Sequence, residues 1–440
     1  MATEGDQVAE SSTGVSAASL ALFRILFGLV MAGGMIRFLL NGWVEELFLR
    51  PAFHFPYPGF EWVRPWPGWG MHLHVMVVAF FALAMAAGWH YRLASFLFFI
   101  GFTWLELIDQ TNYLNHYYLV SLLAGWMTIL PAHRLWSVDS RIKPGVRSPA
   151  IPRWPLNLLR FQFGIVYGFA GIAKLNPDWI LHAQPMRIWL AARSDLPLIG
   201  PWLDQTWIAY AASWFGAVYD LTIPFFLLWH RTNPVAFCAV VFFHVLTGLL
   251  FPIGMFPWIM TIGATLFFAP SWPMDLAKRL GVRIQPTACS SPKPMTPLPP
   301  LGKAMIGAYV AAQILLPMRC LLYEGNTHWT YDGFNAAWKV MIAEKRGHVT
   351  FDCVDRLEQR HWRVDPKTLL TPRQSVMMAQ DPYLIRQFAR HLSEQEGGRI
   401  EVRADAFATL NGRPSQRLID RTVDLSQPEI RDWILPLESD

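Results

Sequence analysis

The sequence feature that most limits the fold is the recurrence of apolar segments about as long as a lipid bilayer is thick. A helix needs roughly 20 mainly apolar residues to cross the hydrocarbon core, and fewer when long side chains at its ends reach the interface. Only 16% of the 440 residues are charged, whereas soluble domains carry about 25%. We therefore predict an α-helical integral membrane protein with about nine transmembrane helices. The predicted spans are residues 19–40, 73–89, 93–108, 117–130, 156–173, 208–229, 235–250, 256–269 and 301–318.

The lysines and arginines between these spans predict the orientation of the chain. Loops after even-numbered spans contain twelve such residues, whereas loops after odd-numbered spans contain four. Short cytoplasmic loops are enriched in positive charge, so the N-terminus is predicted to be cytoplasmic. An odd number of spans then sends the C-terminus to the opposite side. The sequence has no N-glycosylation sequon, which fits the cytoplasmic (inner) membrane of a bacterium.

Composition divides the chain into a membrane region and polar parts. Residues 1–18 are predicted to be a polar cytoplasmic leader, since they lack the basic region of a signal peptide. Residues 19–270 hold the first eight spans, and the Pro- and Ser-rich residues 271–300 are predicted to be a cytoplasmic linker. The last span, residues 301–319, leads to an extracytoplasmic domain at residues 320–440.

Local patterns in the C-terminal region predict a small α+β, β-rich extramembrane domain. Apolar and polar residues alternate over 349–353 and over 399–409, as in half-buried strands. The second stretch ends at an Asn-Gly pair, residues 411–412, which is a strong turn signal. Thr371 and Asp381 each precede a proline, which is typical of an N-cap followed by the first residue of a helix. Two short helices are therefore expected between the strands.

Polar side chains near the ends of the spans are candidate functional residues, because ionisable groups are costly in lipid. Lys174 ends the fifth span, and His116 follows Asn115 at the outer start of the fourth. Glu106 and Asp109 close the third span. In the predicted topology the four ionisable residues of this set lie at the outer leaflet, which suits a single cavity.

Each candidate also has a structural interpretation. Lys174 could extend to the membrane interface, and His116 could cap a helix. Asp220 and His244, midway along the sixth and seventh spans, could form a buried structural pair. Glu106 and Asp109 could be simple interfacial residues.

Metal, thiol and nucleic-acid chemistry lack a matching pattern. His72 and His74 are two residues apart, so they point to different sides of a helix. None of the four cysteines forms a CxxC pair, and a disulfide between Cys320 and Cys353 stays an open question. The net charge of +5 is spread over short loops. We predict no metal site and no nucleic-acid partner.

Several motifs, in order along the chain, resemble vitamin K-dependent gamma-glutamyl carboxylase and its bacterial homologues, the HTTM (horizontally transferred transmembrane) family. The similarity extends from about Ala18 to Asp424. The motifs are Asn-His-Tyr-Tyr-Leu at residues 115–119, Ala-Gly-Ile-Ala-Lys-Leu-Asn-Pro-Asp-Trp at 170–179, Phe-His at 243–244, Phe-Pro-Ile-Gly-Met-Phe at 251–256, Tyr-Glu-Gly-Asn-Thr-His-Trp at 323–329, Trp-Lys-Val-Met at 338–341 and Leu-Leu-Thr-Pro-Arg-Gln at 369–374.

The resemblance implies a carboxylase that uses vitamin K hydroquinone, or menaquinol, together with O2 and CO2. In that reaction a lysine deprotonates the quinol, O2 converts it to the epoxide, and the base formed on the way removes the γ-proton of a glutamate, which takes up CO2. By motif, the lysine corresponds to Lys174, and the family's active-site histidine and the asparagine before it correspond to His116 and Asn115.

The same resemblance places a quinol, arriving from the lipid phase, near these residues. A lysine that acts as a base must be neutral, and an apolar position favours that state. His116 and Asn115 could hydrogen-bond a developing oxyanion. A carboxylate close to Lys174, such as Asp178, would instead favour the charged amine. The predicted quinol-binding residues are Tyr117, Asp178, Trp179, Asp220 and His244.

Departures from the family leave other functions open. The chain is far shorter than the animal enzyme and lacks much of the extramembrane region that holds propeptide-bearing substrates, so the glutamate-containing peptide or protein partner is less supported than the quinol. A quinol epoxidase without carboxylation is the nearest alternative. A non-catalytic quinone-binding or partner-recruiting module is another. A transporter fits poorly, because the polar candidates gather at one face and no internal repeat is visible.

Overall fold

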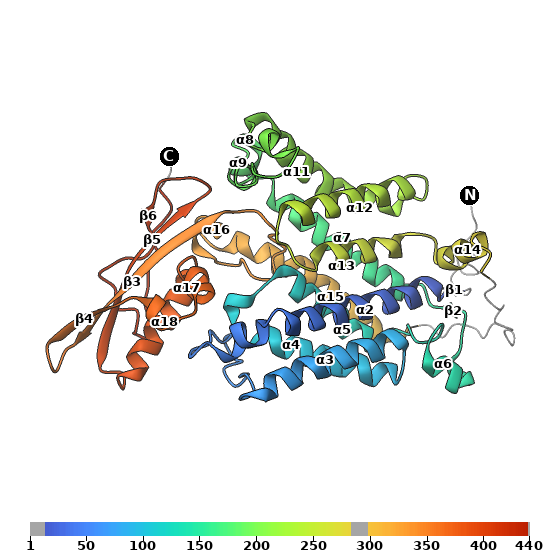
Figure 1. Cartoon of the computed structure of the whole chain (residues 1–440), viewed down its shortest axis with the longest axis horizontal. Helices are drawn as coiled ribbons and strands as arrows, with labels where there is room; N and C mark the ends of the chain where they lie inside the picture. The colour runs from blue at the N-terminus through green and yellow to red at the C-terminus, as the bar shows by residue number, and fades with distance from the viewer. Residues whose placement is uncertain (1–13, 283–297, 439–440) are drawn as a thin grey trace.

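The computed structural model describes residues 14–282 and 298–438. Figure 1 shows the helices of the first two thirds of the chain running along the long axis of the molecule, with the C-terminal sheet at one end. The first described residues lie at the opposite end, beside helix α14 (Trp272–Arg279). The two polar ends of the molecule are thus separated by the length of the helices.

Each predicted span coincides with a helix of the described chain. Six of these helices are long and apolar enough to cross a membrane, namely α2, α3, α7, α11, α12 and α15. The bounds are α2 (Ala18–Leu40), α3 (Trp69–Ala87), α4 (Tyr91–Leu107), α5 (Asn115–Met127), α7 (Trp154–Ala173), α11 (Thr206–Leu228), α12 (Asn233–Leu250), α13 (Phe256–Ala264) and α15 (Pro300–Met318).

The expectation of nine full spans is therefore met only in part. Helices α4, α5 and α13 contain 17, 13 and 9 residues, which is short for a bilayer crossing. Local hydrogen bonding separates α4 from α5. The Asp109 side chain accepts a bond from the Thr111 amide and caps a short 3-10 helix, Gln110–Asn112, and α5 begins after it, at Asn115.

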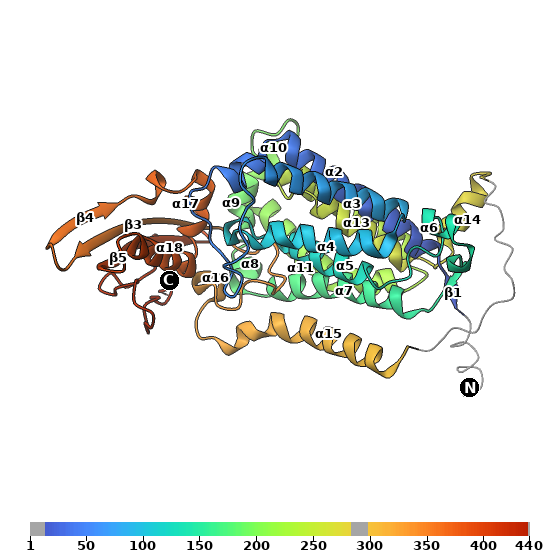
Figure 2. The same ribbon diagram turned by 90° about the horizontal axis from the view of Figure 1, so that it is seen from below.

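Close approach between neighbouring helices forms the membrane core. Helix α2 packs on α3, α3 on α4, α4 on α5, and α7 on α11. At Gly28 a Cβ would lie 2.7 Å from the Ala82 carbonyl oxygen, so only glycine permits this contact. Helix α15 lies apart from the others along one side (Figure 2). It is joined to them by polar bonds, in which Tyr309 donates to Gln162 and Gln313 donates to Tyr118.

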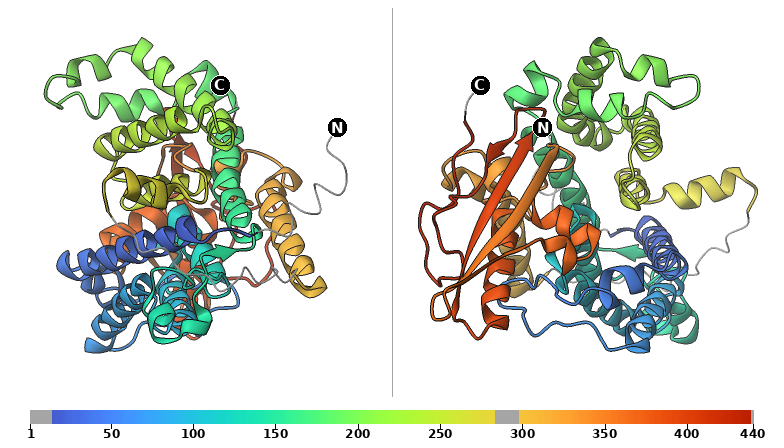
Figure 3. Two further views of the ribbon diagram at one scale, coloured as in Figure 1. Left: turned by 90° about the vertical axis from the view of Figure 1, so that its right-hand side faces the viewer. Right: turned by 60° about the vertical axis from the view of Figure 1, so that its left-hand side comes forward.

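The C-terminal domain is an antiparallel sheet in the order β4-β3-β5-β6. Helices α17 and α18 pack against it (Figure 3), and Phe388 of α18 contacts Phe351 of β3. The alternation at 349–353 and at 399–409 is confirmed as β3 and β5, and Thr371 and Asp381 are the N-caps of the two helices. The bounds are β3 (Lys345–Asp355), β4 (Arg360–Val364), α17 (Pro372–Met378), α18 (Pro382–Gln395), β5 (Ile400–Leu410) and β6 (Gln416–Arg417).

Contacts from the loops of the membrane region fix this domain to the end of the helices. Phe55, in the loop after α2, is fully buried in the core of the C-terminal domain. Gln374 of α17 donates to Asp109 Oδ2 over 2.8 Å, and Arg373 donates to Asn112 Oδ1 over 2.9 Å. Asp109 is therefore a docking residue for the domain, which explains why a carboxylate stands at the end of α4.

The structure differs in detail from the predicted leader and linker. The leader and linker predictions fall partly on residues 1–13 and 283–297, including Cys289, which lie outside the described residues. Within the predicted linker, residues 272–279 form helix α14. Strand β1 (Val15–Ser16) pairs with β2 (Ala150–Ile151) just before α2. Cys320 and Cys353 are both free thiols, so the disulfide left open above does not form.

Candidate functional site

Two cavities lie where the membrane helices meet the C-terminal domain. The larger has a volume of about 460 Å³ and is lined by His116. The smaller has a volume of about 90 Å³ and is lined by Lys174. We call them the His116 chamber and the Lys174 chamber. Both are lined by Ile253, Phe256, Val340 and Met341, and these four residues form a shared wall.

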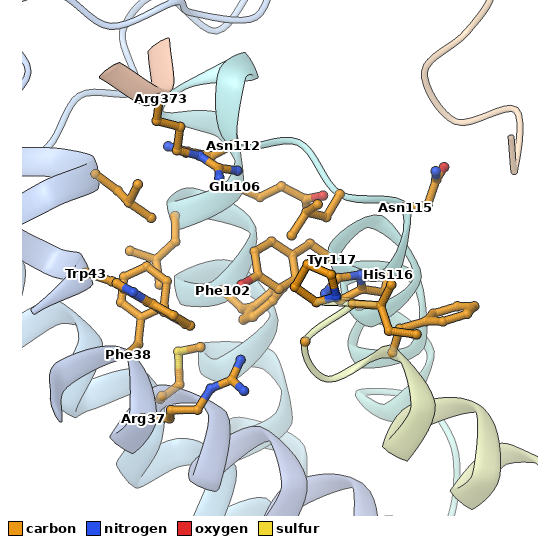
Figure 4. A pocket seen from close by; sticks show the side chains of 18 of the residues that line it. Arg37, Phe38, Trp43, Phe102, Glu106, Asn112, Asn115, His116, Tyr117 and Arg373 are labelled. Atoms are coloured by element: carbon orange, nitrogen blue, oxygen red, sulfur yellow. The ribbon is translucent and has the colours of Figure 1, made fainter. Parts of the chain in front are cut away.

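Charged side chains from several elements surround the His116 chamber (Figure 4). Arg37 comes from α2 and Glu106 from α4, while Arg373 reaches in from α17 of the C-terminal domain. Glu106 Oε2 accepts a hydrogen bond from the Ser121 hydroxyl over 2.7 Å. The chamber thus presents two arginines and, with Glu46, two carboxylates among apolar and aromatic side chains.

His116 is held in this chamber by the turn before α13. Its side chain is 9% exposed and its ring lies 6.1 Å from that of Phe256. Gly254 has a φ of 61°, and a Cβ there would lie 3.7 Å from His116 Nε2. The left-handed backbone explains the glycine in the 251–256 motif, because other residues adopt that conformation at a cost.

Asn115 and Tyr117 flank His116 in the sequence but contact different parts of the structure. Asn115 Nδ2 donates to the Lys339 carbonyl over 3.2 Å, and the Tyr113 hydroxyl donates to Asn115 Oδ1 over 3.1 Å. Asn115 borders the chamber, but its side chain turns away from His116 (Figure 4) and ties α5 to the C-terminal domain. Tyr117 lines the chamber and packs edge-on against Phe102.

An ion pair dominates the Lys174 chamber. Lys174 Nζ lies 2.8 Å from Asp220 Oδ2 and also donates to the Ala170 carbonyl over 3.2 Å. It lies 5.2 Å from the centre of the Trp179 ring. The side chains of both ions are 7% exposed. Lys174 therefore does not extend to the interface; it points into an apolar chamber and meets a buried carboxylate.

His244 lines the same chamber but does not pair with Asp220. Its Nε2 is 2.9 Å from the Tyr167 hydroxyl, so the suggested Asp220–His244 pair is wrong. The Phe256 ring lies 5.7 Å from the His244 ring and also contacts His116. One aromatic side chain thus separates the histidines of the two chambers.

Asp178 lines neither chamber. Both its carboxylate oxygens accept hydrogen bonds from Arg413, and Asn411 donates to it as well. Burial works to raise the pKa of Asp178, but the bonds from Arg413 and Asn411 outweigh it and hold the pKa below its ordinary value. The prediction that Asp178 binds quinol is therefore replaced by a docking contact with the C-terminal domain, and its carboxylate does not meet Lys174.

The single cavity expected for the outer-leaflet residues is in fact two chambers. Glu106 and His116 line one, Lys174 lines the other, and Asp109 lines neither. Sequence reasoning missed Arg37, although an ionisable residue within a predicted span is the signal that selected the others. It also missed Arg373 and Met341, which lie inside motifs at 369–374 and 338–341.

Possible metal ligands in the described part of the chain are dispersed. Among residues 14–282 and 298–438, no group of three or more His, Cys, Asp or Glu side chains is arranged to hold a metal ion. His74 instead bonds with the Trp66 indole and lies 2.9 Å from the Gly101 carbonyl oxygen.

Comparison with known proteins agrees with this architecture. The HTTM domain model matches residues 13–272, and the model of the vitamin K-dependent gamma-carboxylase lumenal domain matches residues 299–440. No solved structure matches the chain. The two matches follow one another along the chain as the motifs predicted, and the protein is a multi-pass membrane protein. The chain therefore belongs to the HTTM and vitamin K-dependent gamma-carboxylase family.

Proposed function

We propose that this protein is a quinol-dependent gamma-carboxylase in which Lys174 is the base that takes the quinol proton. The carrying observation is the buried Lys174–Asp220 pair in an apolar chamber that shares a wall with the His116 chamber. The quinol, vitamin K hydroquinone or menaquinol, supplies the reducing equivalents for O2 and, through its oxidation, the base for glutamate deprotonation. The product pair would be a quinone epoxide and a γ-carboxylated glutamate.

The hydrogen bonds of Lys174 suit a group that gains and loses one proton. A neutral amine has two N–H donors and one lone pair, whereas an ammonium has three donors. Asp220 and the Ala170 carbonyl accept two bonds from Nζ. Before proton transfer, the third position on Nζ carries the lone pair that accepts the quinol hydroxyl proton. After transfer, it carries an N–H that donates to the resulting quinol oxyanion. Asp220 holds the amine in place and balances its charge after the transfer. Because a nearby carboxylate favours the charged amine, Lys174 must give up its resting proton before it acts as the base.

The volumes of the two chambers bear on how the ring of a quinol would reach Lys174. The Lys174 chamber, with a volume of about 90 Å³, leaves less room for a two-ring head group. The His116 chamber is several times larger. We propose that the head group occupies the His116 chamber and reaches Lys174 when the flexible Met341 side chain moves out of the wall. His116, Tyr117, Trp179 and His244 would then line its path.

The arginines of the His116 chamber favour an anionic second substrate. Arg37 and Arg373 line this chamber together with Glu46 and Glu106, and arginine binds carboxylates through two parallel hydrogen bonds. A glutamate side chain held there would lie beside the same wall. The C-terminal domain, which contributes Arg373, is proposed to face the extracytoplasmic side, with the N-terminus in the cytoplasm.

A coupled product assay tests the function. Purified protein in nanodiscs is given vitamin K hydroquinone, O2, labelled bicarbonate and a short glutamate peptide, and epoxide and fixed label are measured together. Both products are expected from the wild type and neither from Lys174→Ala. A matched control is Lys303→Ala, which removes an exposed lysine at the start of α15.

Partial outcomes separate the alternatives. Epoxide without fixed label would replace the carboxylase by a quinol epoxidase. If neither product forms with vitamin K hydroquinone or menaquinol, the enzyme proposal fails and a quinone-binding or partner-recruiting role takes its place.

A further inference from the structure

A third cavity lies within the C-terminal domain, next to the shared wall. It has a volume of about 110 Å³ and is bordered by helix α16 (Thr327–Thr330) and the segment that leads into β3. Figure 1 shows both elements where the sheet meets the membrane helices. We call it the tail pocket. Met341 lines this pocket and both chambers, so the three cavities meet at one side chain.

The polar lining of the tail pocket consists of groups that can donate hydrogen bonds. Two of them are lysine amines, and no carboxylate lines the pocket. An amine, an imidazole, a phenol and a primary amide can each direct an N–H or O–H at a bound group. The polar lining residues are His328, Tyr331, Lys339, Lys345 and Gln380.

Lys345 is the most buried of these groups. It is 6% exposed, and its Nζ donates to the Trp329 carbonyl over 2.5 Å. The same amine lies 5.1 Å from the Trp329 ring centre and 4.7 Å from that of Tyr331. Within the described chain neither Lys345 nor Lys339 forms an ion pair with an acidic side chain. The charge of Asp381 acts on Lys345 without forming an ion pair with it, so burial of the amine stays costly, and an anion in the pocket would lower that cost.

His328 provides the second, independent observation. Its Nε2 is buried and has no hydrogen-bond partner among the described residues. Buried polar atoms almost always have partners, so an exception calls for an explanation. An acceptor atom in the tail pocket would complete the bonding of both His328 and Lys345.

We infer that the tail pocket binds a small planar oxyanion of the carboxylate class, held by His328, Lys339 and Lys345. Its volume of about 110 Å³ leaves room for a small anion such as bicarbonate or acetate. The anion has two possible sources, bicarbonate from solution or a carboxylate group of a peptide. The site is separate from the base at Lys174 and does not depend on the proposed reaction.

The protonation of the pocket agrees with this assignment. Burial lowers the pKa of Lys345 to about 7 and that of His328 to about 4, and it also lowers the pKa of Lys339. A bound anion would raise all three, so binding takes up protons and weakens as the pH rises through about 7. Other side chains that act on these three groups are Asp178, Arg319, Cys320 and Asp381.

Ligand-dependent melting of the full chain in nanodiscs tests the site. Sodium bicarbonate, sodium acetate and a short glutamate peptide are compared with sodium chloride at equal ionic strength, because a ligand that binds the folded state raises the melting temperature. The wild type is expected to melt higher with the oxyanion than with chloride. Lys345→Met and His328→Ala should each weaken binding about tenfold, as for a lost charge-assisted bond. Lys367→Met, at an exposed lysine, should bind as the wild type does.

The ligands also distinguish the two sources. Stabilisation by bicarbonate alone supports an inorganic ligand, and stabilisation by acetate and the peptide supports a carboxylate group. The proposal is overturned if chloride stabilises as well as every oxyanion, or if both pocket variants bind as tightly as the wild type. Lys174→Ala protein should still bind the anion, so this test does not depend on whether the protein is a carboxylase.

Discussion

The amine of Lys174 lies 2.8 Å from Oδ2 of Asp220, and both side chains are 7% exposed. The two residues are 46 positions apart in the sequence and come from the end of α7 and the middle of α11. Each ion of such a buried pair depends on the other, because removing one leaves the charge of the other uncompensated. The catalytic proposal therefore treats the lysine and its carboxylate as one unit.

Loss of the lysine amine should remove quinol oxidation. Lys174→Ala is expected to lower the rate of epoxide formation by at least about 100-fold, the usual contribution of a general base. Epoxide is quantified by chromatography at saturating quinol. Unchanged turnover in this variant, with Lys303→Ala also active, would exclude Lys174 as the base.

Loss of the Asp220 charge should affect turnover more than binding. Asp220→Asn keeps the shape of the side chain but no longer balances a protonated Lys174, so kcat is expected to fall about tenfold or more. The quinol KM should change little. Asp275→Asn, at an exposed aspartate, is the control. A rise in KM with no change in kcat would instead make Asp220 a binding residue.

The size of the side chain at Met341 should control access to Lys174. Met341→Trp is expected to block quinol oxidation, because a rigid indole in the shared wall cannot move aside as a thioether chain does. Met341→Leu should retain most of the activity, and Met318→Trp on the exposed face of α15 tests for a general effect of a new indole. Full activity of Met341→Trp would show that the ring reaches Lys174 by another route.

The Asp178–Arg413 contact should contribute to docking of the C-terminal domain. Their side chains are 12% and 20% exposed, and Arg413→Met is expected to destabilise the folded protein by about 2 kcal/mol. Because the folded-state pKa of Asp178 is lowered, this stability is present above the pKa of an unfolded aspartate. It is lost as the pH falls through the lower folded value. Denaturant unfolding measures both effects, and Arg346→Met, in an exposed pair, should cost little.

The stability of the C-terminal domain should rise with pH above neutrality. Lys345 has a folded pKa of about 7, whereas an unfolded lysine titrates near 10.4, so between these values the unfolded state binds more protons. Stability is then expected to increase by up to about 1.4 kcal/mol per pH unit. The increase should disappear in Lys345→Met and persist in Lys367→Met. An equal slope in both variants would assign the effect to another group.

The sequence by itself determined the helices, the main sheet and the family. An apolar segment in lipid must pair its own backbone N–H and C=O groups. It therefore forms a helix regardless of which segments surround it. The caps at Thr371 and Asp381 and the Asn-Gly turn after β5 are equally local, and each was predicted from adjacent residues. Local signals did not reveal that α13 has only nine residues, because the apolar segment at 256–269 continues beyond it as a 3-10 helix.

Only the tertiary structure decided which side chains meet. Asp178 lies in the same sequence motif as Lys174, and Asp220 lies midway along the next predicted span. In the structure Asp220 pairs with Lys174, whereas Asp178 pairs with Arg413. Whether a carboxylate on one helix meets an amine on another depends on the rotation of each helix and on where the C-terminal domain docks. Those are set by packing among distant residues, which no local pattern encodes. For the same reason Met341, an ordinary apolar residue in the sequence, lies where three cavities meet.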